Sequence, residues 1–79
     1  MPMFFFDVAD DQALSRDDTG LEMPSTQAAR REAVASLLSI GRDRLAPSFQ
    51  SIAIDVRDAR DHVVFAAALS LRITVQEDE

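Results

Sequence analysis

Cysteine is absent from this 79-residue sequence, which excludes disulfide bonds, thiolate zinc sites and cysteine nucleophiles. Lysine is also absent, so all eight basic residues are arginine. No apolar run approaches the roughly 18 residues of a membrane-spanning helix, and the first residues do not form a basic region followed by an apolar one. We therefore expect a soluble cytoplasmic protein that does not associate with membranes.

Acidic residues outnumber basic residues by fourteen to eight, which gives a net charge of −6. A surface of this sign repels phosphate backbones, so no nucleic-acid partner is expected. Apolar residues make up 47% of the chain, with only two glycines and three prolines, as is typical of a packed domain. The length allows one domain, and we assign residues 1–79 to it.

The first third of the sequence predicts two strands. Residues 3–8 form an aromatic run in which Phe4, Phe6 and Val8 share one face. A turn signal, Asp17-Asp18-Thr19-Gly20, separates this run from a short second strand over residues 21–23, which we expect at a sheet edge. Gly20 is expected to supply the turn conformation.

A helix is predicted over residues 26–45, with Ser25 or Thr26 as its N-cap. One apolar stripe recurs at helical spacing, and its alanines allow close approach to a sheet. The stripe consists of Ala29, Ala33, Leu37 and Ile40, and is widened by Val34 and Leu38. Gly41 is expected to make a close contact or to weaken the helix locally. Pro47 would end the helix, and Phe49 would close one end of the core.

Strict alternation predicts two further strands, over residues 52–57 and 63–75, joined by a loop over residues 58–62. The order is therefore β-β-α-β-β. The simplest unknotted arrangement is an α+β two-layer sandwich: a four-stranded antiparallel sheet of order 2-1-3-4, with one helix packed on one face. Residues 76–79 are expected to form a frayed acidic tail.

The last strand is too long for a sheet of this size, since thirteen residues at about 3.3 Å each span about 43 Å. It either bends, or its second half pairs beyond its own chain, because it lies on an open edge. The sheet face away from the helix is small and apolar, which favours a homodimer or a complex with another protein. The expected interface residues are Met3, Phe5, Val64, Ala66, Ala68, Ser70 and Arg72.

Carboxylates concentrate around the first hairpin and suggest an alternative function, a small-ligand or divalent-cation site. The residues concerned are Asp7, Asp10, Asp11, Asp17, Asp18 and Glu22. The spacing of a calcium-binding loop is absent, however, and a solvated acidic turn explains the same residues. No metal site or cofactor is therefore assigned.

Catalytic motifs are lacking. His62, the single histidine, lies in a polar loop beside Asp61, and no serine has the surroundings of a nucleophile elbow. The two glycines are isolated, so no phosphate-binding loop is encoded. The Phe4-Phe5-Phe6 run with Arg57 and Arg72 resembles a stacking platform for single-stranded RNA, but the net charge opposes it. We expect no enzymatic activity.

Three segments carry a resemblance to a known family: Met1–Asp7, Asp17–Pro24 and the Ala-rich start of the helix. They resemble a family of small bacterial proteins of unknown function, common in rhizobia-like genomes. Its members open with Pro-x-(Tyr/Phe)-(Tyr/Phe)-Phe-Asp and carry Asp-x-x-Gly-x-Glu-(Leu/Met)-Pro before an Ala-rich helix. The resemblance implies no activity and no catalytic residues.

A fold-level likeness to HicB-type antitoxins rests on the hairpins, the crossover helix and the acidity. The DNA-binding segment appended in those antitoxins is absent from the 79 residues. Together these features favour a non-enzymatic interaction or regulatory module that homodimerises.

Overall fold

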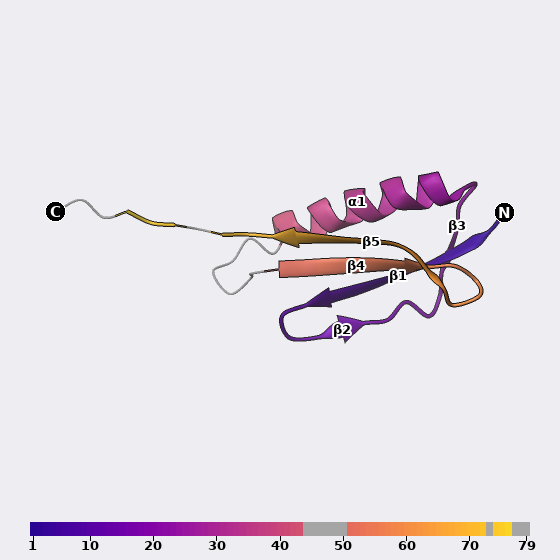
Figure 1. The fold of residues 1–79 in the computed structure, drawn as a ribbon, viewed down its shortest axis with the longest axis horizontal. Coiled ribbons are helices and arrows are strands. Elements are labelled where there is room, and N and C mark those ends of the chain that lie inside the picture. The colour runs from indigo at the N-terminus through magenta and orange to yellow at the C-terminus, as the bar shows by residue number, and fades with distance from the viewer. Residues whose placement is uncertain (44–50, 73, 77–79) are drawn as a thin grey trace.

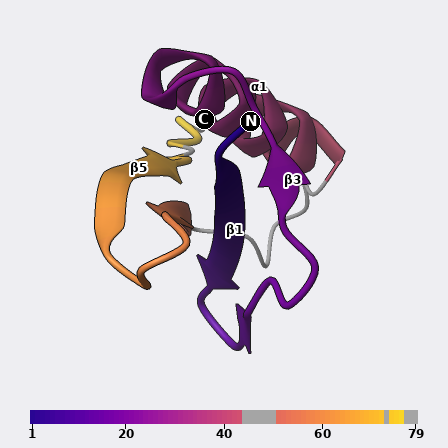
Figure 2. The same ribbon diagram turned by 90° about the vertical axis from the view of Figure 1, so that its right-hand side faces the viewer.

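The computed structural model describes residues 1–43, 51–72 and 74–76. The elements follow the chain as shown in Figure 1: β1 (Met3–Asp10), β2 (Leu14–Ser15), β3 (Leu21–Glu22), α1 (Thr26–Asp43), β4 (Ser51–Arg57) and β5 (Val63–Ser70). All strand pairs are antiparallel, and the sheet has the order β2-β1-β4-β5, with β3 paired to β1. Helix α1 covers one face of this sheet (Figure 2). The predicted α+β two-layer class is confirmed.

The strand order differs slightly from the prediction, because two short strands replace the single second strand. β2 pairs with the end of β1 and β3 pairs with its beginning. The tight turn into β2 was not predicted. In this turn Asp10 accepts hydrogen bonds from the N–H groups of Gln12 and Ala13, and its own N–H donates to the carbonyl of Ala13.

The core lies between the helix and the inner face of the sheet. It consists of Phe4 on β1, three residues of β4 and three of α1: Ile52, Ile54, Val56, Ala29, Ala33 and Leu37. The two alanines are fully buried, since their small side chains lie between the helix and the sheet. A Cβ atom on the buried Gly41 would lie only 2.5 Å from Cδ2 of Leu69, so the close contact expected at this glycine is confirmed.

Helix α1 begins after Ser25, whose hydroxyl accepts a hydrogen bond from the N–H of Ala28 over 3.1 Å. Ser25 rather than Thr26 is therefore the N-cap. The helix is described as far as Asp43. The predicted roles of Pro47 and Phe49 lie outside the described residues, as do residues 77–79 of the predicted tail.

Strand β5 ends at Ser70 and not at residue 75 as predicted. Its last partner is Ser51, the first residue of β4, so no β4 backbone remains for later residues to bond. A bulge at the start places Val63 opposite Arg57 and leaves Val64 unpaired. Val63 therefore lies on the outer face, whereas the alternation of the sequence places it on the same face as Phe65.

In the described ranges, the structure contains no helix that combines the length and the apolar character needed to cross a membrane.

Candidate functional site: a buried ion pair and an open sheet edge

A buried ion pair occupies the sheet face away from the helix. Arg57 at the end of β4 donates to Asp7 in the middle of β1 through two bonds, from Nε to Oδ2 over 2.7 Å and from Nη2 to Oδ1 over 3.0 Å. Both side chains are about nine-tenths buried. The guanidinium lies over the ring of Phe5, 5.1 Å from its centroid. The pair is bidentate, which is the strongest geometry for arginine and carboxylate.

The Asp17–Gly20 turn is held against this ion pair. Arg57 donates to the carbonyl of Asp17 over 2.9 Å, and the N–H of Asp17 donates to Asp7 over 2.9 Å. The Asp17 carboxylate accepts from the N–H groups of Phe6, Thr19 and Gly20. The turn therefore covers part of the outer face beside β1.

The loop between β4 and β5 is organised by a second aspartate. Asp58 accepts from the N–H groups of Arg60 and His62. Asp61 has a positive φ of 67° and bonds Arg57 over 2.8 Å and Arg16 over 3.1 Å. His62 is exposed. Asp61 in this loop therefore links Arg57, at the end of β4, to Arg16, which follows β2.

These contacts shift the pKa values of the groups involved. The hydrogen bond from Arg57 lowers the pKa of Asp7, although burial opposes it, and the same bond raises the pKa of Arg57. Burial acts to raise the pKa of Asp17, but its backbone N–H donors outweigh that effect and lower it. The N–H of His62 is the main cause that lowers the pKa of Asp58. Each carboxylate is thus stabilised in its charged form by the fold.

The acidic residues of the first hairpin do not form a cation site in the part of the chain that the structure describes. No three His, Asp or Glu side chains there lie close enough to hold a metal ion. Asp7 and Asp17 have the structural partners given above, and Asp11 accepts a hydrogen bond from the Ser51 hydroxyl over 3.0 Å. Arg57, one residue of the RNA-stacking platform considered from the sequence, donates to the carboxylates of Asp7 and Asp61.

Gly20 is required in the turn for two reasons. Its φ is +79°, and a Cβ atom would lie 2.8 Å from Cε2 of Phe5 and 2.9 Å from Sδ of Met3. The Gly20→Ala substitution should therefore lower the free energy of unfolding by about 2–3 kcal/mol, from the left-handed backbone and the contact together. Urea unfolding measures this. Thr19→Ala, at an exposed neighbour, is the control and should change stability by less than about 0.5 kcal/mol; equal losses in the two variants would contradict this role of Gly20.

Acid should destabilise the fold through Asp7 and Asp17. Because their pKa values are lower in the folded chain than the usual 3.8, they contribute stability above about pH 4, and this contribution is lost as the pH falls through the folded pKa values. Urea unfolding between about pH 6 and pH 2 should show a falling unfolding free energy below about pH 4. Asp17→Asn should make that fall shallower, whereas an unchanged slope would contradict the assignment.

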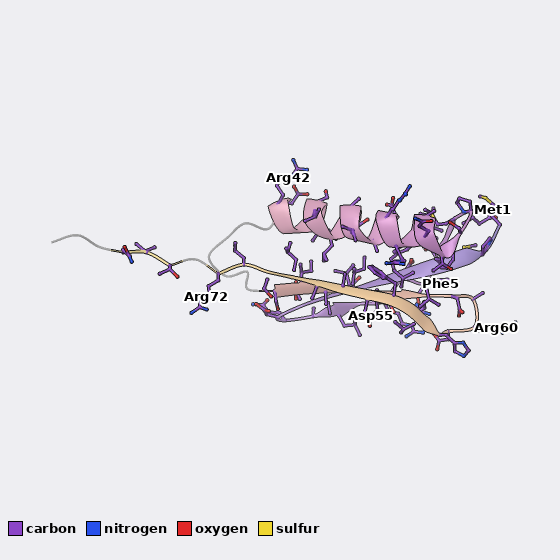
Figure 3. All side chains as sticks on the ribbon, turned by 45° about the horizontal axis from the view of Figure 1, so that its top comes forward. Met1, Phe5, Arg42, Asp55, Arg60 and Arg72 are labelled. Carbon is purple, nitrogen blue, oxygen red and sulfur yellow. The ribbon has the colours of Figure 1, made fainter. Side chains whose placement is uncertain are left out.

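The residues predicted for the interface occupy two different environments. Met3 and Phe5 are half-buried beside the Asp17–Gly20 turn. The other five are exposed and belong to β5 or to the chain after it: Val64, Ala66, Ala68, Ser70 and Arg72. Figure 3 shows Arg72 on the extended segment beyond the sheet, and Asp55 on the sheet face away from the helix.

The two edges of the sheet differ in how they are protected. The edge beside β1 carries only the two-residue strands β2 and β3, with the charged turn between them. The other edge is β5, which pairs with β4 alone among the described elements. Its eight residues include neither a charge nor a proline, although both are common means of preventing edge-to-edge pairing. Apart from the bulge at Val64, β5 is therefore an unprotected edge.

An apolar groove lies between this edge and the helix. It has a volume of about 530 Å³ and is lined mainly by Arg30, Arg31, Val34, Ala35, Leu38 and Phe65. Val34 and Leu38 are 42% and 55% exposed, so this side of α1 leaves large apolar side chains in water. We call it the α1–β5 groove. Together with the β5 edge it forms a continuous surface of the kind that proteins use for association.

The ion pair was not predicted, although the sequence held a signal for it. Asp7 interrupts an apolar run at a position that shares a face with Met3 and Phe5, and Arg57 falls on the same outer face of the neighbouring strand. A carboxylate and an arginine on one face of adjacent strands indicate a pair, and Asp7 rather than Asp55, on the same face, is the partner of Arg57. The α1–β5 groove was missed because Val34 and Leu38 were assigned to the buried stripe.

The chain matches the family model of a domain of unknown function, DUF6894, over residues 3–70. No curated protein and no solved structure matches it, so the likeness to HicB-type antitoxins stays a prediction. The matched range includes Asp7, Asp17 and Gly20, the residues that hold the turn against the ion pair, and it ends at the last residue of β5. This chain is a member of the DUF6894 family.

Proposed function

We propose that this DUF6894 chain is a non-enzymatic interaction or regulatory module that acts as a homodimer, with the β5 edge and the α1–β5 groove as its interface. One observation carries the proposal. The sheet has a protected edge and an unprotected one, and the unprotected edge is the one that borders exposed apolar helix residues. A small domain gains the buried apolar area that it lacks by associating there.

The polar groups of the outer face support a non-enzymatic role. Asp7, Asp17, Arg57 and Asp58 have shifted pKa values, and each of them holds a strand or a loop in place through hydrogen bonds. Among the described residues, no buried polar side-chain atom is left without a hydrogen-bond partner. Their unusual pKa values are thus explained by structure, as in other ion-pair networks. The cytoplasmic location expected from the sequence stays a prediction.

The Leu38→Glu substitution tests the interface. Leu38 is 55% exposed in the single chain, so the variant should fold. A charge at this apolar position of the α1–β5 groove should weaken dimerisation at least about 100-fold, because dimerisation would remove the carboxylate from water and the apolar contact of Leu38 would be lost. Sedimentation over a range of concentrations gives the dissociation constant. We expect a dimer for the wild-type chain and the 8.7 kDa monomer mass for Leu38→Glu.

Ser39→Glu is the matched control. Ser39 is the next residue along the helix and is also exposed, but it lies outside the α1–β5 groove. This variant carries the same added charge and should dimerise as the wild-type chain does. If Leu38→Glu dimerises as tightly as Ser39→Glu, the interface does not lie in the α1–β5 groove.

A further inference from the structure

We propose that the strand that pairs with the β5 edge is the C-terminal segment of a second copy, residues 71–76, exchanged reciprocally between the two chains. The inference rests on the proposed homodimer and names the segment that forms it. β5 stops at Ser70 because β4 offers no further partner. The alternation of the sequence nevertheless continues through Leu71, Ile73 and Val75.

The segment beyond β5 has the character of a strand that lacks its sheet. The chain runs on past Ser70, away from the body of the molecule (Figure 1). Leu71 is half-buried, but Arg72, Thr74 and Gln76 are exposed and Val75 is 75% exposed. An extended segment with alternating apolar residues is not stable as a strand by itself in water, because a strand is stabilised by pairing and by burial of one face.

The pleat of an antiparallel pair restricts the register. Residues directly opposite each other share a face, so the apolar residues of the segment must lie opposite Phe65, Ala67 and Leu69, the inner-face residues of β5. The register that uses the whole regular part of β5 places Ser70 opposite Ser70 of the second copy. Leu71 then lies opposite Leu69, and Val75 opposite Phe65. On the outer face, Thr74 lies opposite Ala66.

The α1–β5 groove fits a strand in this position. Helix α1 runs in the same direction as β5, since Arg30 near its start has its guanidinium over the Phe65 ring, 5.3 Å from its centroid, and Gly41 near its end lies against Leu69. A segment antiparallel to β5 therefore passes Leu38 first, then Val34, and reaches Arg30 last. The six residues of the segment span about 20 Å at 3.3 Å per residue, which is within the roughly 27 Å length of the 18-residue helix α1.

The positive charge of the α1–β5 groove favours the C-terminal segment of a second copy as its occupant over helix α1 of that copy. Arg30 and Arg31 line the α1–β5 groove, whose lining contains no acidic residue. In the sequence, Glu77, Asp78 and Glu79 follow the segment directly, so this end of the chain carries the charge that an arginine-lined groove attracts. Packing α1 against its own copy would instead bring like charges together, which is unfavourable.

The Val75→Arg substitution in the full chain separates this inference from the proposed function. Because Val75 is exposed in the single chain, the fold should remain, as circular dichroism would show. Dimerisation should weaken at least tenfold relative to Thr74→Arg, because Val75→Arg places a positive charge beside Arg30 and Arg31, whereas Thr74→Arg carries the same charge on the outer face of the same segment. If Val75→Arg dimerises as tightly as Thr74→Arg while Leu38→Glu is monomeric, the exchange is wrong and the dimer stands; if Leu38→Glu also dimerises normally, both are wrong.

Disulfide trapping tests the register directly, because the chain has no cysteine of its own. Ala66→Cys combined with Thr74→Cys should give a covalent dimer on a non-reducing gel, since these positions lie opposite each other across the two copies. Within one chain they are eight residues apart along an extended backbone, too far for a disulfide. Neither single variant should cross-link to a comparable extent. A double variant that stays monomeric under oxidation, in a chain that sediments as a dimer, would overturn the proposed register.

Discussion

Replacing Asp7 by Asn should lower the free energy of unfolding by about 3–5 kcal/mol, because it leaves the buried charge of Arg57 without its main partner. Both side chains are about nine-tenths buried, and the two bonds between them are 2.7 and 3.0 Å long. A domain of this size has a total stability near the low end of about 5–15 kcal/mol. The variant should therefore be largely unfolded at room temperature or close to it, as circular dichroism and urea unfolding would measure.

The double variant Asp7→Leu with Arg57→Met is the informative control. Removing both charges leaves no unpaired ion, so this variant should be clearly more stable than Asp7→Asn. It should still lose part of the stability, because the Asp17–Gly20 turn loses its bonds to both side chains. If Asp7→Asn unfolds at the same urea concentration as the wild-type chain, the ion pair has no structural role.

Replacing Leu37 by Ala should lower the unfolding free energy by about 2–5 kcal/mol. The other buried residues of α1 are Ala29, Ala33 and Gly41, so Leu37 is the one large helix side chain that is fully within the core. Its truncation leaves a cavity between the helix and the sheet. Urea unfolding should show the loss, and the helix signal should disappear together with the sheet if the domain unfolds as one unit.

Leu38→Ala is the matched control for that substitution. It removes the same atoms from the adjacent position, but Leu38 is 55% exposed whereas Leu37 is 4% exposed. In the monomer it should change stability by less than about 0.5 kcal/mol. Similar losses for the two variants would mean that the helix is packed on a different face.

Much of the fold was predictable because burial imposes a period on the sequence. The alternation of Ile52, Ile54 and Val56, and the helical spacing of Ala29, Ala33 and Leu37, each define one buried face. Those two patterns, together with the rule that crossover connections are right-handed, are enough to indicate the α+β two-layer fold class. The turn at Gly20 was predictable for a similar reason, because Asp-x-x-Gly is a local signal.

The limits of the prediction are equally physical. The end of β5 depends on where its neighbour β4 begins, and no pattern within residues 63–75 records that. The bond between Asp7 and Arg57 joins residues 50 positions apart, so it requires the register of two strands as well as their order. The exposure of Leu38 depends on the side from which the helix meets the sheet.

Hydrogen–deuterium exchange at two protein concentrations tests the central claim, that the β5 edge and the α1–β5 groove form the interface. In the concentrated sample, amides of β5 and of the helix around Val34 and Leu38 should exchange more slowly than in the dilute one. Amides of β2 and β3, on the protected edge, should exchange equally in both. Slowing that is confined to β2 and β3, or no change in β5 in a sample that sediments as a dimer, would contradict the account.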